Sequence, residues 1–142
     1  MFSLARFEPN WETGQIRKLN TKVEFPLKID MKPYIMTGSN QENDNLEYEL
    51  KSIIVHLGTP SGGHYMAYIW DNMNEKIWNC PESNEEMPEI FMSDPELLLN
   101  WYTFNDTDVK PVNGLSLQEL FGDGKSNKNA YILFYERCDY VE

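Results

Sequence analysis

The chain has 142 residues, 41% of them hydrophobic and 13% aromatic, which suits one globular domain with a buried core and excludes an intrinsically disordered chain. Its 12 Lys and Arg residues against 23 Asp and Glu residues give a net charge of −11, which disfavours binding to nucleic acid or to an anionic membrane. Two cysteines, Cys80 and Cys138, are too few for a disulfide framework and lack the paired spacing of a structural zinc site.

No segment suggests export or membrane insertion. The first eleven residues lack a long apolar run, and no stretch approaches the roughly 18 apolar residues of a membrane span. We therefore expect an intracellular protein, in the cytoplasm, the nucleus or both, whose partners include neither nucleic acid nor a membrane. No repeat or internal boundary is visible, so residues 1–142 are expected to form a single domain.

Short runs of Val, Ile, Tyr, Phe and Trp, bounded by Gly, Pro and Asn, predict strands rather than long helices. Together they favour an α+β fold built on a mainly antiparallel sheet with a few short helices. In chain order, the predicted strands are Phe2 to Phe7, Gln15 to Leu19, Leu50 to Leu57, His64 to Trp70, Ile77 to Asn79, Trp101 to Phe104 and Ala130 to Tyr135.

The segments between these strands predict turns, two short helices and exposed loops. Pro, Asn and Gly in Glu8 to Gly14 predict a hairpin turn. Short helices are predicted for Pro95 to Asn100, and for Ser116 to Phe121, which a glycine follows. The polar stretches Thr37 to Asn45 and Asp123 to Asn129 have few apolar residues and are expected to be exposed loops.

The segment most informative about chemistry is Val55 to Trp70, VHLGTPSGGHYMAYIW. A strand leads into a Gly/Pro/Ser loop, and a second strand begins at His64. Gly62 and Gly63, directly before this histidine, allow the backbone to approach another chain closely. This pattern is typical of a loop that lines a substrate.

Alternation along the second strand places its side chains on two faces. One face carries His64, Met66, Tyr68 and Trp70, and the other carries Tyr65, Ala67 and Ile69. The histidine therefore lies at the rim of an aromatic face.

An imidazole in this place could act as a general base, because imidazoles take and give protons near neutral pH. It would need a partner to fix its tautomer, and Asn105 and Asp106 end an aromatic strand with short polar side chains. From the residues alone the question stays open. An Asn-Asp pair at a strand end is usually a turn, an isolated histidine is more often structural, and we assign His56 to that structural class.

Six motifs extend together over nearly the whole chain. They are LARF at Leu4 to Phe7, RKLNTKVEFPLKIDMKPY at Arg17 to Tyr34, YELKSIIVHLG at Tyr48 to Gly58, GGHYMAY at Gly62 to Tyr68, WYTFND at Trp101 to Asp106, and NAYILFYER at Asn129 to Arg137. In this order they resemble the C-terminal half of the catalytic domain of the ubiquitin-specific proteases, which are thiol-dependent ubiquitin carboxyl-terminal hydrolases.

The resemblance implies the palm-side half of a papain-like cysteine protease fold. In that family's Cys-His-Asn/Asp triad, His64 would be the general base, Asn105 the residue that orients it and Asp106 the supporting neighbour. The activity implied is hydrolysis of the isopeptide or peptide bond after ubiquitin's C-terminal glycine. The implied partners are ubiquitin or ubiquitinated proteins.

The resemblance also implies where the substrate's tail runs. Gly58 to Gly63 and Met31 to Tyr48 correspond to two loops that border the channel for the C-terminal tail of ubiquitin. The residues expected to contact substrate are Gly62, Gly63 and Tyr65.

The family's nucleophile lies in a Gly-Asn-Thr-Cys box, which does not occur here. Cys80 lies in an acidic stretch and Cys138 follows the last predicted strand, surroundings that do not activate a thiolate. We therefore expect the nucleophile and the oxyanion-hole donor in the N-terminal half of the catalytic domain, which becomes a second partner, and we expect this chain alone to be inactive. No cofactor and no metal are expected, since the zinc-binding fingers of many relatives would precede this segment.

Two questions stay open. The first concerns the stretch from Ile77 to Val109, which has no Lys or Arg. It is either a solvated acidic face or a docking surface for a basic tail such as ubiquitin's.

The second question concerns the class of the protein. Instead of a catalytic half, the chain could be a catalytically inactive ubiquitin-binding or scaffold module, or an acidic interaction domain unrelated to ubiquitin. Retention of both His64 and Asn105 argues against the inactive module. Their spacing is longer than the family commonly shows, and we attribute the excess to an acidic insertion, Asn79 to Asn100.

Overall fold

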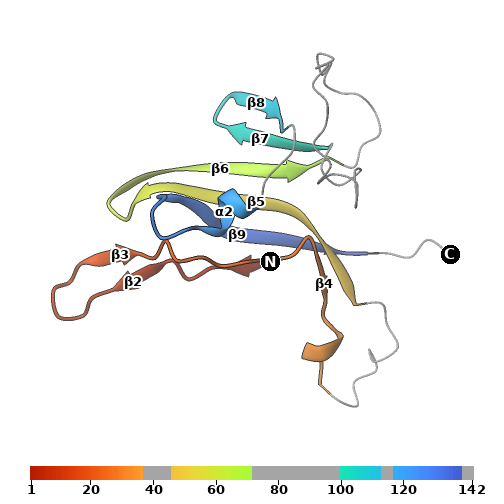
Figure 1. Cartoon of the computed structure of the whole chain (residues 1–142), viewed down its shortest axis with the longest axis horizontal. Helices are drawn as coiled ribbons and strands as arrows, with labels where there is room; N and C mark the ends of the chain where they lie inside the picture. Colours follow the sequence, from red (N-terminus) through yellow and green to blue (C-terminus); the bar gives the residue numbers. More distant parts are fainter. Residues whose placement is uncertain (37–45, 72–99, 113–116, 139–142) are drawn as a thin grey trace.

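The computed structural model describes residues 1–36, 46–71, 100–112 and 117–138. Figure 1 shows the strands and helices that these residues form, coloured along the chain. They are β1 (Phe2–Ser3), β2 (Phe7–Pro9), β3 (Ile16–Lys18), β4 (Lys28–Asp30), the 3-10 helix η1 (Lys32–Tyr34), β5 (Glu47–Thr59), β6 (Gly62–Trp70), β7 (Trp101–Asn105), β8 (Asp108–Pro111), α2 (Gln118–Phe121) and β9 (Lys128–Arg137).

A seven-stranded antiparallel sheet dominates the fold. Its strand order is β1-β9-β5-β6-β7-β8, and β4 pairs with the N-terminal end of β5. The strands β2 and β3 form a separate hairpin that extends from one end of the molecule (Figure 1). The mainly antiparallel sheet with a short helix predicted from the sequence is confirmed.

The β5–β6 hairpin sets the geometry of the site. Thr59 pairs with Gly62, so only two residues connect the strands, and Leu57 lies opposite His64. On the other side of β6, Ala67 pairs with Phe104 of β7. Because β7 runs antiparallel to β6, its last residues return to the end of β6 that carries the histidine.

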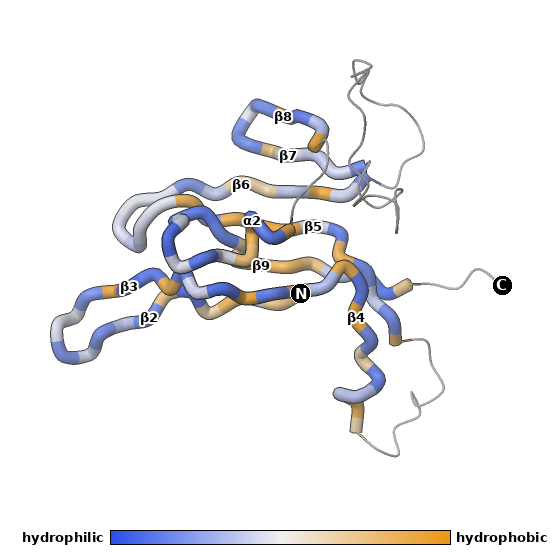
Figure 2. The backbone as a smooth tube through the Cα atoms, in the orientation of Figure 1, coloured by the Kyte–Doolittle hydropathy of each residue, from blue (hydrophilic) through white to orange (hydrophobic). Residues whose placement is uncertain are grey.

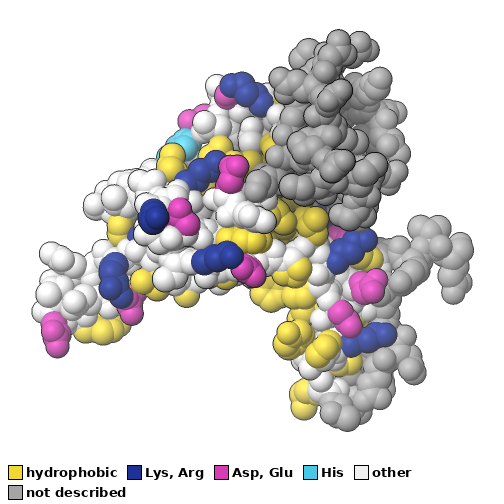
Figure 3. Space-filling model, in the orientation of Figure 1, with side chains coloured by type: hydrophobic (Ala, Val, Ile, Leu, Met, Phe, Trp, Pro, Cys, Tyr) yellow, Lys and Arg dark blue, Asp and Glu magenta, His cyan; other side chains and the backbone are white. Residues whose placement is uncertain are grey.

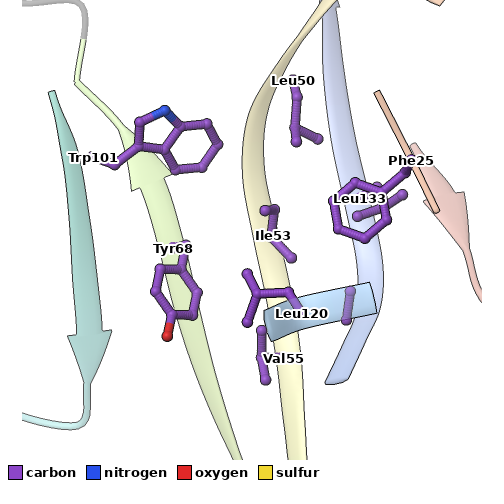
Figure 4. Packing of buried hydrophobic residues seen from close by; sticks show 9 residues of the cluster. Phe25, Leu50, Ile53, Val55, Tyr68, Trp101, Leu120 and Leu133 are labelled. Atoms are coloured by element: carbon purple, nitrogen blue, oxygen red, sulfur yellow. The ribbon is translucent and has the colours of Figure 1, made fainter. Parts of the chain in front are cut away.

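The hydrophobic core lies on one face of this sheet. Ile53 of β5, Tyr68 of β6 and Trp101 of β7 are buried there, with Leu120 of α2 packed over them (Figure 4). Met66 and Trp70 also pack against this core, which confirms the predicted alternation along β6. The hydropathy colouring shows the longest hydrophobic stretches in β5 and β9, at the centre of the sheet (Figure 2).

The opposite face is less covered. Register places Ile54, Ala67, Phe104 and Ile132 in one row across four strands, and all four side chains are only partly buried. A further apolar surface lies at the β4–η1 corner (Figure 3), where Met36 is 84% exposed.

Several elements differ from the sequence-based expectations. The predicted strand Phe2 to Phe7 is split in two, because the chain turns at Arg6, whose backbone N–H donates to Leu4 O at 2.7 Å. β4 and β8 were not predicted. β8, with the sequence DVKP, lacks the alternation of a half-buried strand, and its proline is tolerated because the strand lies at the sheet edge.

The C-terminal helix and loop are slightly shorter than predicted. α2 covers Gln118–Phe121, and β9 begins at Lys128, two residues inside the predicted loop. Three predictions lie outside the described residues: the strand Ile77 to Asn79, the loop Thr37 to Asn45 and all but the last residue of the helix Pro95 to Asn100.

Candidate functional site

The structure brings two of the predicted catalytic side chains together. His64 Nε2 lies 2.5 Å from Asn105 Oδ1, although the residues are 41 positions apart in the sequence. An amide oxygen only accepts hydrogen bonds, so Nε2 carries the proton. The other ring nitrogen, Nδ1, then keeps its lone pair and can accept a proton from a nucleophile.

Asp106 lies beside this pair in a constrained turn. Its φ of 53° is in the left-handed region, which Asp tolerates better than most residues. The register pair Asn105–Asp108 leaves two residues in the β7–β8 turn, and such tight turns require positive φ. Asp106 Oδ2 is 3.8 Å from His64 Nε2, and the Asp106 side chain is 79% exposed. This contact is therefore weaker than the one between His64 and the Asn105 amide.

The glycines of the loop play different structural roles. A Cβ on Gly63 would lie 2.2 Å from His56 Nε2, and a Cβ on Gly58 would lie 2.7 Å from Gly62 O. Both positions therefore exclude side chains by packing within this chain. A Cβ on Gly62 would meet nothing within 4 Å, so Gly62 is the glycine whose open side faces solvent.

A pocket of about 390 Å³ opens beside this loop, on the sheet face opposite the core. Aromatic rings form its walls: the ring of His56 is 5.3 Å from that of Phe7 and 4.9 Å from that of Tyr65. The lining residues are Phe7, Ile16, His56, Thr59, Pro60, Ser61, Gly62, Gly63, Tyr65 and Tyr131.

Sequence reasoning identified Tyr65, Gly62 and Gly63 in this region but missed Phe7 and His56. A signal for His56 existed: a two-residue turn at Pro60 and Ser61 sets the hairpin register, which places His56 directly opposite Tyr65. The contribution of Phe7 depends on the separate β2–β3 hairpin and had no local signal.

His56 is a buried, neutral imidazole in the wall of the pocket. The residue is only 3% exposed. Burial lowers the pKa of His56, and the charge of Lys18 lowers it further. Its Nδ1 has no hydrogen-bond partner among the described residues. These surroundings fit a packing role, because a buried imidazole resists protonation.

Cys138 lies far from His64. Its N–H donates to Glu47 O at one end of the β5–β9 ladder. The other end of this ladder is the pair Leu57–Lys128, and Leu57 lies opposite His64. Ten residues along a strand span about 33 Å. Burial raises the pKa of the Cys138 thiol, which disfavours the thiolate. Cys80 lies outside the described residues.

Within the described part of the chain, no group of three or more His, Cys, Asp or Glu side chains is arranged to hold a metal ion. None of the helices described there is long and apolar enough to cross a bilayer.

Comparison with known proteins places this chain in a family. Residues 1–135 match the profile described as "Ubiquitin carboxyl-terminal hydrolase". Human ubiquitin carboxyl-terminal hydrolase 34 is 28% identical over 99% of this chain. The probable ubiquitin carboxyl-terminal hydrolase FAF of Drosophila melanogaster is 33% identical over 96% of it. The chain spans only 4% and 6% of the length of these two relatives.

Solved structures agree. The chain resembles a structure of the yeast SAGA DUBm with an Sgf73 mutant at 28% identity and a TM-score of 0.59, covering 96% of this chain and 22% of that one. A structure of the SAGA Ubp8/Sgf11/Sus1/Sgf73 DUB module gives a TM-score of 0.60 at the same identity, with 23% of that chain covered. The profile match covers most of the sequence, and the chain belongs to the ubiquitin carboxyl-terminal hydrolase family.

Proposed function

We propose that this chain is the C-terminal catalytic half of a deubiquitinating cysteine protease, supplying the general base His64 and its orienting residue Asn105. The observation that carries the proposal is the 2.5 Å contact between the imidazole Nε2 and the amide oxygen. It leaves Nδ1 as the free base, at an accessible rim where the His64 side chain is 41% exposed. Asp106 supports the pair from the adjoining turn.

In this proposal the nucleophilic cysteine comes from the N-terminal half of the catalytic domain, outside residues 1–142. His64 Nδ1 takes the thiol proton, and the thiolate attacks the carbonyl carbon of ubiquitin's C-terminal glycine. The imidazolium then gives that proton to the leaving amine as the isopeptide or peptide C–N bond breaks. Loss of the amine leaves ubiquitin bound to the cysteine as a thioester. Water, deprotonated by the same imidazole, attacks this thioester; the C–S bond breaks, the ubiquitin carboxylate is released, and the imidazolium returns the proton to the cysteine sulfur.

The pocket beside the glycine loop supports a route for the ubiquitin tail. Gly62 offers a backbone without a side chain, and Tyr65, which is 51% exposed and follows His64 in the sequence, offers an aromatic wall. Narrow backbone passages favour glycine-ended tails because a side chain would not fit. The net charge of −11 would also attract a basic tail at short range.

The less covered sheet face supports the second partner. Partly buried apolar side chains of Ile54, Ala67, Phe104 and Ile132 form a row there, and apolar surface of this kind is usually covered in the assembled protein. We assign it to the N-terminal half of the catalytic domain.

We also place the protein inside the cell, in the cytoplasm, the nucleus or both, where a catalytic thiol stays reduced.

Reconstitution tests the proposal. The chain is mixed with the N-terminal half of its parent, and release of a fluorophore from the C-terminus of ubiquitin is followed. We expect activity only in the mixture, and we expect His64→Ala to reduce it by about 10³-fold or more, since removal of a triad base has effects of this size.

A His56→Phe variant is the matched control. It removes the other imidazole and keeps an aromatic ring in the pocket wall. We expect kcat to stay within about fivefold, because His56 does not contact the reacting atoms, so any effect of the altered wall falls on KM. Equal rates for wild type and His64→Ala would refute the assignment of the base. A complete parental reading frame without a cysteine box upstream would instead favour the inactive, ubiquitin-binding module.

A further inference from the structure

Lys18, at the end of β3, makes an unusual set of contacts. Its ammonium donates to three backbone carbonyls: Asn127 O at 2.5 Å, His56 O at 3.0 Å and Gly58 O at 3.4 Å. No ion pair found among the described residues includes it. The charge is therefore directed at main-chain oxygens of two other segments.

These carbonyls lie around the end of the β5–β9 ladder: His56 belongs to its second-last pair, and Gly58 and Asn127 lie just beyond its last pair. The β5–β9 ladder stops at the pair Leu57–Lys128, and the next contact is a single bond from Gly58 N–H to Asn127 O at 3.1 Å. Beyond the last pair, backbone groups need other partners. The Lys18 ammonium supplies donors at this point, which is the root of the loop from Gly58 to Gly63.

The loop has little freedom to shift from this root. Gly58 has a φ of +116° and approaches the backbone of Gly62 and Gly63 closely, while Gly63 lies against the His56 ring. Lys18 holds the carbonyls of both His56 and Gly58. Holding them fixes the backbone on which the turn and the pocket wall are built.

We propose that Lys18 is a positioning residue that fixes the root of the glycine loop in its tail-binding position before the substrate arrives. The inference rests on the proposed function and deepens it. Ordering a loop in advance lowers the entropy lost on binding, so the effect falls on substrate binding more than on turnover, because the His64–Asn105 contact does not involve Lys18.

Arg6 provides a comparison within the molecule. Its guanidinium also binds only carbonyls, those of Leu19, Thr21, Phe121 and Ala130. None of these belongs to the β5–β6 hairpin, so Arg6 serves packing around α2 and β9. It also shows that a guanidinium can take such a set of acceptors in this fold.

The test compares Lys18 variants of the complete parental protease on ubiquitin carrying a C-terminal fluorophore. Lys18→Met keeps the apolar length and removes the donors, and we expect KM to rise about tenfold with kcat within about threefold. Lys18→Arg should recover most of the loss. The control is Lys22→Met, whose lysine is exposed and paired with Glu24, and it should match wild type. An unchanged KM, or a loss confined to kcat, overturns the proposal.

Amide hydrogen exchange in the same proteins gives a second reading that does not depend on activity. In Lys18→Met, or in the milder Lys18→Gln if the first fails to fold, the Gly58 amide should exchange at least about tenfold faster while that of Ile53 in the core is unchanged. Unchanged exchange, or equal acceleration at both amides, overturns the positioning role. A wild type that does not cleave ubiquitin would instead refute the proposed function, and Gly58 exchange would still report on the loop.

Discussion

The two histidines of the β5–β6 hairpin lie in contrasting surroundings. His64, the third residue of β6, has its side chain 41% exposed and an amide oxygen 2.5 Å from Nε2. His56, on the neighbouring strand, is 3% exposed and lies between the rings of Phe7 and Tyr65, with no partner found for its Nδ1 among the described residues. One imidazole is accessible and oriented, whereas the other is enclosed and neutral.

Under the proposed function, this difference suits the hairpin to two purposes. Proton transfer needs access and a fixed tautomer, and only the first histidine has both. A pocket wall needs an uncharged ring, which burial provides at the second. Gly63 links the two, because it precedes His64 in the chain and packs directly against the His56 ring.

After loss of the base itself, the largest effect should come from removing the partner of the exposed histidine. In the reconstituted protease, Asn105→Ala leaves the His64 ring free to rotate and to change tautomer, so we expect kcat to fall by about 10²-fold or more. Thermal unfolding should be unchanged, because Asn105 is exposed and contributes little packing.

Asp106→Asn is the matched control for this prediction. Asn also tolerates the left-handed φ of 53°, so the turn is preserved while the carboxylate charge near His64 is removed. We expect a loss of less than about tenfold, because an exposed contact at 3.8 Å is weak. A larger loss at Asp106 than at Asn105 would show that the carboxylate, not the amide, orients the base.

Much of the exposed site could be predicted from the sequence. Local signals marked the candidate residues there, namely two glycines before His64, alternation along β6, and an aromatic strand ending in Asn105, but they left the pairing of His64 with Asn105 open. The match to family motifs related these separate signals to each other. Antiparallel pairing of β6 and β7 brings the end of one strand back to the start of the other and so allows the 2.5 Å contact.

The surroundings of His56 could not be predicted in the same way. Its pocket combines β5, β6 and β9 with Phe7 and Ile16 from the β2–β3 hairpin, and nothing local to those residues indicates which sheet face they approach. The carbonyl contacts of Lys18 are equally non-local, since they join residues up to 109 positions apart. Packing between distant segments, not strand propensity, decides such contacts.

A smaller effect is expected when the glycine between the two histidines is changed. Gly63→Ala would place a methyl group 2.2 Å from His56 Nε2 and 2.8 Å from Leu57 O, an overlap that should lower the free energy of unfolding by about 1–3 kcal/mol. Gly62→Ala is the control, since its Cβ would meet nothing within 4 Å and should change stability by less than about 0.5 kcal/mol. Denaturant titration distinguishes them, and equal values would mean that the His56 contact does not constrain the loop.

The smallest effect concerns pH and isolates the buried histidine. Burial lowers the pKa of His56, so between about pH 7 and 5 the unfolded chain, with an ordinary histidine pKa near 6.5, binds more protons than the folded one. The stability that His56 contributes is present above pH 6.5 and is lost as pH falls toward its folded pKa. The free energy of unfolding should therefore decrease across this range in wild type and less in His56→Phe, which has no group to titrate.

Glu49 and Asp123, whose pKa values are lowered by hydrogen bonds to Lys51 and to backbone N–H groups, affect stability only below about pH 4.5. A slope unchanged in His56→Phe would assign the pH dependence to other groups and remove the distinction between the two imidazoles.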